Sequence, residues 1–191
     1  MSEYVLRSAR FQAAEVLNRV IQNGDTVVDA TMGNGHDTVM LAKLVGENGH
    51  VYAFDVQEMA VASTRQKLEA EGLLERVTLL CTGHQNMKMH VPVSVRAVAF
   101  NLGWLPGGDK SITTLWETTF PAINAALDLL LPMGVCTVCV YPGHEAGEKE
   151  RKALAEYLAN LPPQRYNILR QTFINAGPGA PECFVIQRQG A

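Results

Sequence analysis

The pattern of hydrophobic and polar positions changes its period repeatedly along the chain, and it predicts alternating helices and strands. Apolar residues recur every three or four positions in segments that we expect to be helices: residues 8–22, 37–45, 57–71, 113–131 and 145–160. Short runs rich in β-branched residues predict strands at residues 26–30, 50–56, 76–81, 95–100, 134–141, 166–173 and 183–188. The run 134–141 shows no alternation, which is typical of a strand covered on both faces.

Strands that alternate with helices favour a doubly wound α/β fold with a mostly parallel, Rossmann-like sheet. The last two strands are separated only by a Pro/Gly turn at residues 177–181, so we expect an antiparallel last strand. A chain of 191 residues with 47% hydrophobic side chains can build one core, and we expect a single domain over residues 1–191. Ligands of such sheets bind outside the carboxyl ends of the strands.

Composition narrows the class of protein only a little. The net charge of −3 gives no general attraction for nucleic acid. No hydrophobic targeting segment and no long apolar run is present, so we expect a cytoplasmic protein without a membrane span. The four cysteines lie in predicted buried strands, and we expect reduced core residues: Cys81, Cys136, Cys139 and Cys183. Since residues three apart on a strand face opposite sides, positions 136 and 139 predict neither a metal site nor a disulfide.

The first predicted strand runs into a glycine loop, residues 29–38 (DATMGNGHDT), and then into a helix. Gly33 and Gly35 lack the Cβ atom that would keep a flat ligand away from the backbone. Asp55 ends the second strand, where a carboxylate can accept hydrogen bonds from ribose hydroxyls. This pattern fits two cofactors, a dinucleotide and S-adenosylmethionine.

Two details of the loop favour S-adenosylmethionine. The dinucleotide fingerprint requires a third glycine where the chain has Thr38. Asp29 and Asp37 would repel a pyrophosphate, whereas they attract a sulfonium and an ammonium. Asp37 as a simple helix cap and Asp29 as a simple turn residue remain alternatives. We assign further cofactor contacts to the same strand ends, with His84 beside the adenine: Thr31, Gly33, Asn34, Gly35, Thr38, Val56, Gln57, His84 and Asn101.

The loop after the fourth strand suggests how a methyl acceptor is held. Asn101 can accept the hydrogens of an amino group, and Trp104 can stack on a nucleobase. The spacing is similar to the Asn-Pro-Pro-aromatic motif of amino-methyltransferases, with Leu and Gly in place of the prolines. A turn-forming Asn101 and a core Trp104 remain alternatives.

The loop after the fifth strand supplies a second candidate group. His144 follows a Tyr-Pro-Gly turn, and an imidazole can accept a proton from an amine; a purely structural histidine is the alternative. Asn101 and His144 are therefore the candidate catalytic residues. We group Lys110 and Tyr141 with Trp104 and His144 as substrate-binding residues.

With these residues in place, the chain resembles a small family of class I methyltransferases first labelled rRNA methylases. The resemblance is carried by the strings GNGHDT, NLGWLPGGDK and YPGH and by the turn from Asn175 to Pro181. Characterised members are MnmM-type tRNA methyltransferases. The resemblance implies methylation of the amine of 5-aminomethyl-2-thiouridine at the wobble position of tRNA. Phe11 and Glu145 depart from the family's pattern, and both departures concern the substrate pocket rather than the cofactor site.

Other functions remain open at the level of the residues. The acceptor can be rRNA or a small-molecule amine, and the alternative classes are a dinucleotide oxidoreductase and a non-catalytic binding module. A monomer or a homodimer is expected. The basic residues that could contact tRNA are Arg7, Arg10, Lys110, Lys149, Arg151, Lys152 and Arg165, of which positions 149, 151 and 152 are more typical of a solvated helix face.

Overall fold

The computed structural model describes residues 8–190 and places all of their strands in one sheet. The order across the sheet is β3-β2-β1-β4-β5-β7-β6. In chain order these strands are β1 (Thr26–Asp29), β2 (His50–Asp55), β3 (Val77–Cys81), β4 (Val95–Asn101), β5 (Leu130–Val140), β6 (Tyr166–Gln171) and β7 (Glu182–Arg188). The predicted Arg7 contact lies outside the described residues.

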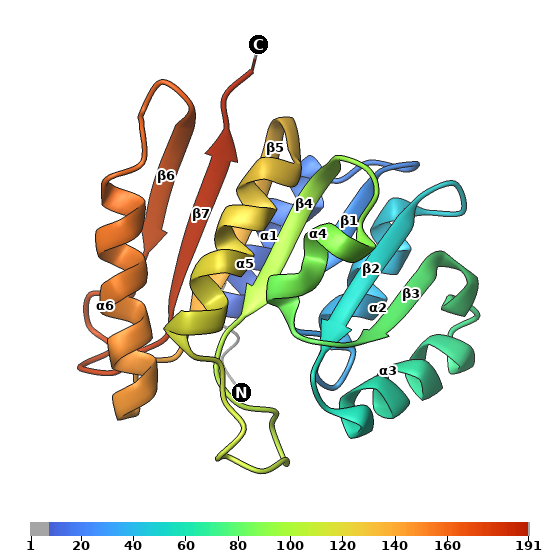
Figure 1. The fold of residues 1–191 in the computed structure, drawn as a ribbon, viewed down its shortest axis with the longest axis horizontal. Coiled ribbons are helices and arrows are strands. Elements are labelled where there is room, and N and C mark those ends of the chain that lie inside the picture. The colour runs from blue at the N-terminus through green and yellow to red at the C-terminus, as the bar shows by residue number, and fades with distance from the viewer. Residues whose placement is uncertain (1–7, 191) are drawn as a thin grey trace.

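Strand direction confirms the predicted fold class. Strands β1 to β5 are parallel to one another, and β7 runs antiparallel to both β5 and β6. The last strand therefore lies inside the sheet, between β5 and β6, because the Pro/Gly turn lets it fold back beside β6. The outer position is taken by β6 (Figure 1).

Helices cover both faces of the sheet (Figure 1). One face packs against α1 (Ala9–Val20), α2 (His36–Val45) and α3 (Glu58–Ala70). The opposite face packs against α4 (Met87–His90), α5 (Trp116–Leu129) and α6 (Glu145–Ala159). The pattern missed α4 and two single 3₁₀ turns, η1 (Leu74–Arg76) and η2 (His84–Asn86), because so short a helix cannot show a period. None of the described helices is long and apolar enough to cross a membrane.

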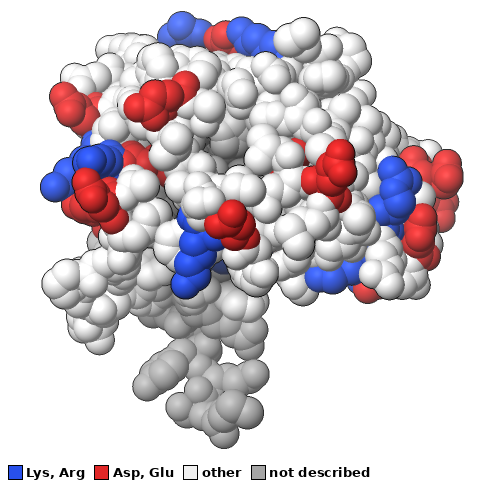
Figure 2. Space-filling view, turned by 60° about the horizontal axis from the view of Figure 1, so that its bottom comes forward, with Lys and Arg blue, Asp and Glu red and all other residues white. Residues whose placement is uncertain are grey.

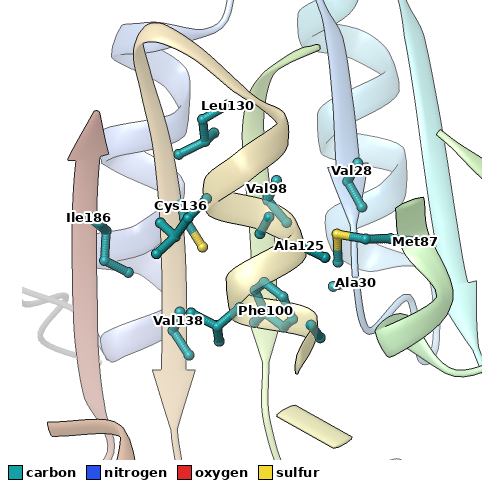
Figure 3. Packing of buried hydrophobic residues seen from close by; sticks show 14 of the residues in the cluster. Val28, Ala30, Met87, Val98, Phe100, Ala125, Leu130, Cys136, Val138 and Ile186 are labelled. Carbon is teal, nitrogen blue, oxygen red and sulfur yellow. The ribbon is translucent and has the colours of Figure 1, made fainter. Parts of the chain in front are cut away.

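Successive residues of the central strands feed two different core clusters. Val28 and Val98 point toward α4 and α5 and pack with Phe100, as Figure 3 shows. Their neighbours Val27 and Ala97 belong to the cluster under α1 and α2. This two-sided burial holds the central strands rigidly and fixes the positions of the loops at their carboxyl ends.

Three of the four cysteines are buried, and the faces on which they lie follow this alternation. Cys136 lies in the cluster beneath α5, whereas Cys139 and Cys183 lie together beneath α1, so positions 136 and 139 face opposite sides as predicted. Burial raises the pKa of the Cys136 thiol. Cys81, at the end of edge strand β3, is exposed, and its prediction as a core residue is wrong. Within the described residues, no group of His, Cys, Asp and Glu side chains could hold a metal ion.

Candidate active site

A cavity of about 520 Å³ opens at the carboxyl ends of the parallel strands. Its size is within the range of small-molecule and cofactor sites. The loops after β1, β2, β3, β4 and β5 all contribute to its wall, as expected for a doubly wound sheet. The predicted site residues that line it are Thr31, Gly33, Asn34, Asp37, Asp55, Val56, Gln57, His84, Asn101, Trp104, Tyr141 and His144.

Asp29, Thr38, Gly35 and Lys110 do not line the cavity. Asp29 is fully buried beneath the loop, where its oxygens accept hydrogen bonds from Thr38 Oγ1 at 2.7 Å and from the Thr31 amide at 3.2 Å. Burial, helped by the nearby Asp37 charge, raises the pKa of Asp29 to about 7. Asp29 and Thr38 thus tie the turn together below the ligand space, which is the alternative role left open for Asp29.

The two glycines of the loop serve different purposes. Gly33 lines the cavity, and a Cβ atom there would come within 3.4 Å of Leu105. Gly35 has φ 79°, and a Cβ atom there would lie 2.8 Å from Thr64 Oγ1 in α3. We predicted that both glycines bring backbone to a ligand, but Gly35 is required by its left-handed backbone and by the close approach of α3.

Asp55 holds the glycine loop while facing the cavity. One carboxylate oxygen accepts a hydrogen bond from the Gly33 amide and the other from the Gln57 amide, both at 3.0 Å. Burial raises the pKa of Asp55. Each oxygen keeps a second lone pair, so the carboxylate can also accept bonds from ligand hydroxyls.

Asn101 is held from two directions at the end of β4. Its amide N–H donates to Thr31 Oγ1 at 2.7 Å, and its side-chain Nδ2 donates to Asp37 at 2.5 Å. Its Oδ1 atom is buried and has no hydrogen-bond partner among residues 8–190. A buried acceptor without a partner is costly unless a ligand supplies the missing donor, so the site offers Oδ1 to an N–H or O–H group.

Arg10 completes this arrangement, although sequence reasoning assigned it only to tRNA contact. Arg10 lines the cavity and forms an ion pair with Asp37 at 2.7 Å. The pair spans 27 sequence positions, so no local pattern could reveal it. Because Arg10 neutralises Asp37 and Asp29 is buried, the loop presents less negative charge to a ligand than the sequence predicted.

Trp104 and His144 meet across the cavity wall, with ring centroids 4.3 Å apart. His144 Nδ1 accepts a hydrogen bond at 3.2 Å from the amide of Gly147 in the first turn of α6. A ring nitrogen that accepts is unprotonated, so the neutral ring carries its hydrogen on Nε2, which is buried without a partner among the described residues. Lys110 Nζ lies 5.5 Å from the Trp104 ring centroid, within range of a cation–π contact.

A buried glutamate supports the loop that carries Trp104. Glu150 of α6 is 3% exposed and accepts hydrogen bonds from Thr114 at 2.8 Å and Thr119 at 2.6 Å. Thr114 Oγ1 in turn accepts from the Gly103 amide. These contacts keep Thr114 out of α5, which begins at Trp116, later than predicted. Sequence reasoning missed Glu150 because it looked like part of a charged, solvated helix face.

The remaining candidates are His84, which lines the cavity, and four basic residues that do not line it. His84 is buried, its pKa is lowered to about 4 by burial, and its Nδ1 lies 3.2 Å from the Ala30 carbonyl, so the ring is neutral. Lys149 pairs with Glu145, and both Arg151 and Lys152 pair with Glu148. Lys149 and Lys152 are exposed, as expected for a solvated helix face, whereas the Arg151 side chain is only 17% exposed. Arg165 precedes β6, at the end of the sheet opposite the cavity.

Comparisons with known proteins agree with this geometry. Residues 51–187 match the model of the family described as "Putative rRNA methylase". An Arabidopsis thaliana protein, the chloroplastic tRNA (mnm(5)s(2)U34)-methyltransferase, is 40% identical over 184 residues, which is 91% of this chain and 67% of that protein. A Clostridium thermocellum structure described as a "putative rRNA-methylase" has a TM-score of 0.95 and 42% identity, covering 97% of this chain and 100% of its own.

A further similar structure was solved with a ligand. It is a methyltransferase described as "putative" from Streptococcus mutans in complex with SAH, with a TM-score of 0.88 and 34% identity, covering 96% of this chain and 99% of its own. These findings confirm the resemblance that the sequence motifs indicated. The chain belongs to the "Putative rRNA methylase" family and has the fold of the class I S-adenosylmethionine-dependent methyltransferases.

Proposed function

We propose that the protein methylates the amine of 5-aminomethyl-2-thiouridine at the wobble position of tRNA, with S-adenosylmethionine as the methyl donor. The observation that carries the proposal is the buried Asn101 Oδ1 in the cavity wall beside Trp104, which has no partner within the described part of the chain. The Arabidopsis relative, named for the same modified nucleoside, supports this acceptor. The family description names rRNA, whereas the relative with 40% identity is named for a tRNA wobble nucleoside, and nothing in the described site favours a small-molecule amine or a dinucleotide reaction.

The residues present fit the cofactor. Asp55 would accept bonds from the ribose hydroxyls, and Val56, Gln57 and His84 line the part of the cavity that suits the adenine. Gly33 and Asn34 line the part of the cavity where the amino-acid part of the cofactor would lie. When bound, the cofactor supplies a methyl group activated by a sulfonium.

The acceptor amine must be held close, aligned and unprotonated. Asn101 Oδ1 accepts one amine N–H, which orients the nitrogen lone pair away from the protein oxygen. Trp104 provides a face on which the pyrimidine stacks. Tyr141 keeps its proton, because burial raises its pKa to about 12.

The geometry of His144 changes its proposed role. The lone pair of Nδ1 is engaged by the Gly147 amide, so neutral His144 offers an N–H donor rather than a base. We propose that Nε2–H donates to a carbonyl oxygen of the pyrimidine. The amine then loses its proton to water before it reacts.

The experiment uses tRNA from a strain that lacks the final methyl group. Purified protein, labelled S-adenosylmethionine and this tRNA should yield 5-methylaminomethyl-2-thiouridine, identified by nucleoside mass spectrometry. In the Asn101→Ala variant we expect methyl transfer to fall by about 100-fold while cofactor affinity changes little. Label found only in rRNA, or no label in either RNA, would refute the proposed acceptor.

Three further expectations, on domain organisation, location and oligomeric state, belong to the same proposal. We propose that residues 1–191 act as one catalytic domain, that the protein works in the cytoplasm and that it is a monomer or a homodimer. The Arabidopsis relative is chloroplastic, so the location of this chain has to be determined directly, by microscopy of a tagged protein.

A further inference from the structure

Arg10 lies at the cavity, whereas basic residues of an amphipathic helix usually face solvent. It lies in the first turn of α1, and its side chain reaches the loop after β1, where Nε and Nη2 are both 2.7 Å from Asp37 Oδ1. The Arg10 side chain is 40% exposed, whereas the Asp37 side chain is 14% exposed. Two donors on one carboxylate oxygen hold this carboxylate more tightly than a single lysine could.

The other oxygen of Asp37 faces Asn101. It accepts the hydrogen bond from Asn101 Nδ2 at 2.5 Å. If the Asn101 amide turned over, its Oδ1 would meet the carboxylate oxygen, and two acceptors would repel each other. The carboxylate therefore decides which end of the amide faces the cavity, and that end is Oδ1.

We propose that Arg10 is a positioning residue for methyl transfer, which acts through Asp37 to fix the Asn101 amide with Oδ1 toward the acceptor amine. This inference rests on the proposed amine acceptor. Asp37 also lies close enough to Asp29 for the two charges to interact, so Arg10 keeps Asp37 in place against this repulsion. The role differs from the phosphate contact that the sequence suggested, because the guanidinium is already paired.

A double-mutant cycle distinguishes a positioning role of Arg10 from a phosphate contact with tRNA. Single-turnover methyl transfer is measured for the wild type, Arg10→Gln, Asn101→Ala and the double variant, with tRNA and cofactor saturating. We expect about a 10-fold loss for Arg10→Gln, about 100-fold for Asn101→Ala and no more than about 100-fold for the double variant, because the two residues act as a unit. Losses that multiply, or a weaker tRNA affinity as the main effect of Arg10→Gln, would overturn the proposal.

A matched control lies on the same helix. Arg19 is 80% exposed and, among residues 8–190, pairs with Glu15 at 4.0 Å, so Arg19→Gln removes the same charge without touching the cavity. This variant should keep the wild-type rate. Arg10→Lys, which retains the charge but not the two-donor geometry, should recover only part of the rate.

A second readout does not depend on the substrate. In protein labelled with ¹⁵N-asparagine, the Asn101 side-chain amide protons should shift markedly in Arg10→Gln and remain in place in Arg19→Gln. An unchanged Asn101 signal in Arg10→Gln would refute the positioning role even if tRNA proves not to be the acceptor. A shifted signal combined with no methylation of tRNA would instead refute only the proposed function.

Discussion

His144 can be tested through the separate tasks of its two ring nitrogens. Asn at this position keeps an acceptor for the Gly147 amide, whereas Gln reaches farther and keeps a donor near the place of Nε2. We expect His144→Asn to keep its thermal stability and to lose about tenfold or more in methyl transfer. His144→Gln should lose about 2–4 °C in Tm and keep most of its activity.

The variant expected to be more stable is the one expected to be less active, and this opposite order makes the comparison decisive. A purely structural histidine predicts that activity follows stability, so that Gln is the worse variant. A general base predicts that both variants lose activity equally. Circular dichroism melts and single-turnover rates on the same preparations distinguish these outcomes.

Asp29 makes the stability of the protein depend on pH in an unusual direction. Its pKa is raised to about 7 in the folded protein, above the ordinary aspartate value of 3.8, mainly because it is fully buried. Between these two values the folded protein binds more protons than the unfolded chain, so the free energy of unfolding falls as pH rises from about 4 to 7. Above pH 7 this contribution is constant.

The size of the effect is on the order of 4 kcal/mol, from about 1.4 kcal/mol for each pKa unit. Asp29→Asn keeps an acceptor and cannot ionise, so its unfolding free energy should vary less over this range. Urea unfolding at pH 4.5, 6 and 7.5 measures the difference between variant and wild type. Parallel pH profiles for the two proteins would show that Asp29 titrates normally.

Glu150 connects two elements, since it belongs to α6 and supports the loop between β4 and α5. Glu150→Ala would leave the buried hydroxyl of Thr119 without its acceptor and release Thr114. We expect a loss of about 2–3 kcal/mol in unfolding free energy and faster proteolysis between residues 103 and 115. Glu156 lies on the same helix and is exposed, so Glu156→Ala is the matched control and should behave as the wild type.

The elements themselves were largely predictable, because each has a clear period or a buried apolar run. The errors lie where tertiary contacts decide an end. Helix α5 begins at Trp116 because Thr113 pairs with Trp104 and Thr114 binds Gly103, and neither contact has a local signature. Strand β5 begins at Leu130, before the predicted 134, since Leu130 pairs with Val95 of β4.

Much of the cavity wall was also predictable, since polar residues that end parallel strands must gather at one edge of the sheet. The finer geometry was not. Arg10 comes from a distant helix, and the approach of Thr64 to Gly35 depends on how α3 packs. The charge of the loop was overestimated for the same reason, because burial of Asp29 and pairing of Asp37 appear only in three dimensions.

At the scale of the whole molecule, the charge distribution predicts how tRNA binds. Figure 2 shows a face on which Lys and Arg side chains are separated from one another and lie near Asp and Glu. The net charge is −3, and several basic candidates are paired with acids: Arg10, Lys149, Arg151 and Lys152. Few cations of the described residues are therefore free to replace counterions on phosphates.

We expect the tRNA affinity to depend only weakly on salt, with a slope of about −2 to −3 in a plot of log K against log salt concentration, as for about three phosphate contacts. Recognition should then rest on the modified base in the cavity, and an anticodon stem-loop carrying 5-aminomethyl-2-thiouridine should bind nearly as well as whole tRNA. Fluorescence anisotropy between 50 and 200 mM salt measures both quantities. A slope near −6, or a stem-loop that binds far more weakly than tRNA, would indicate an extended phosphate-binding surface, and the cavity would then be a minor part of recognition.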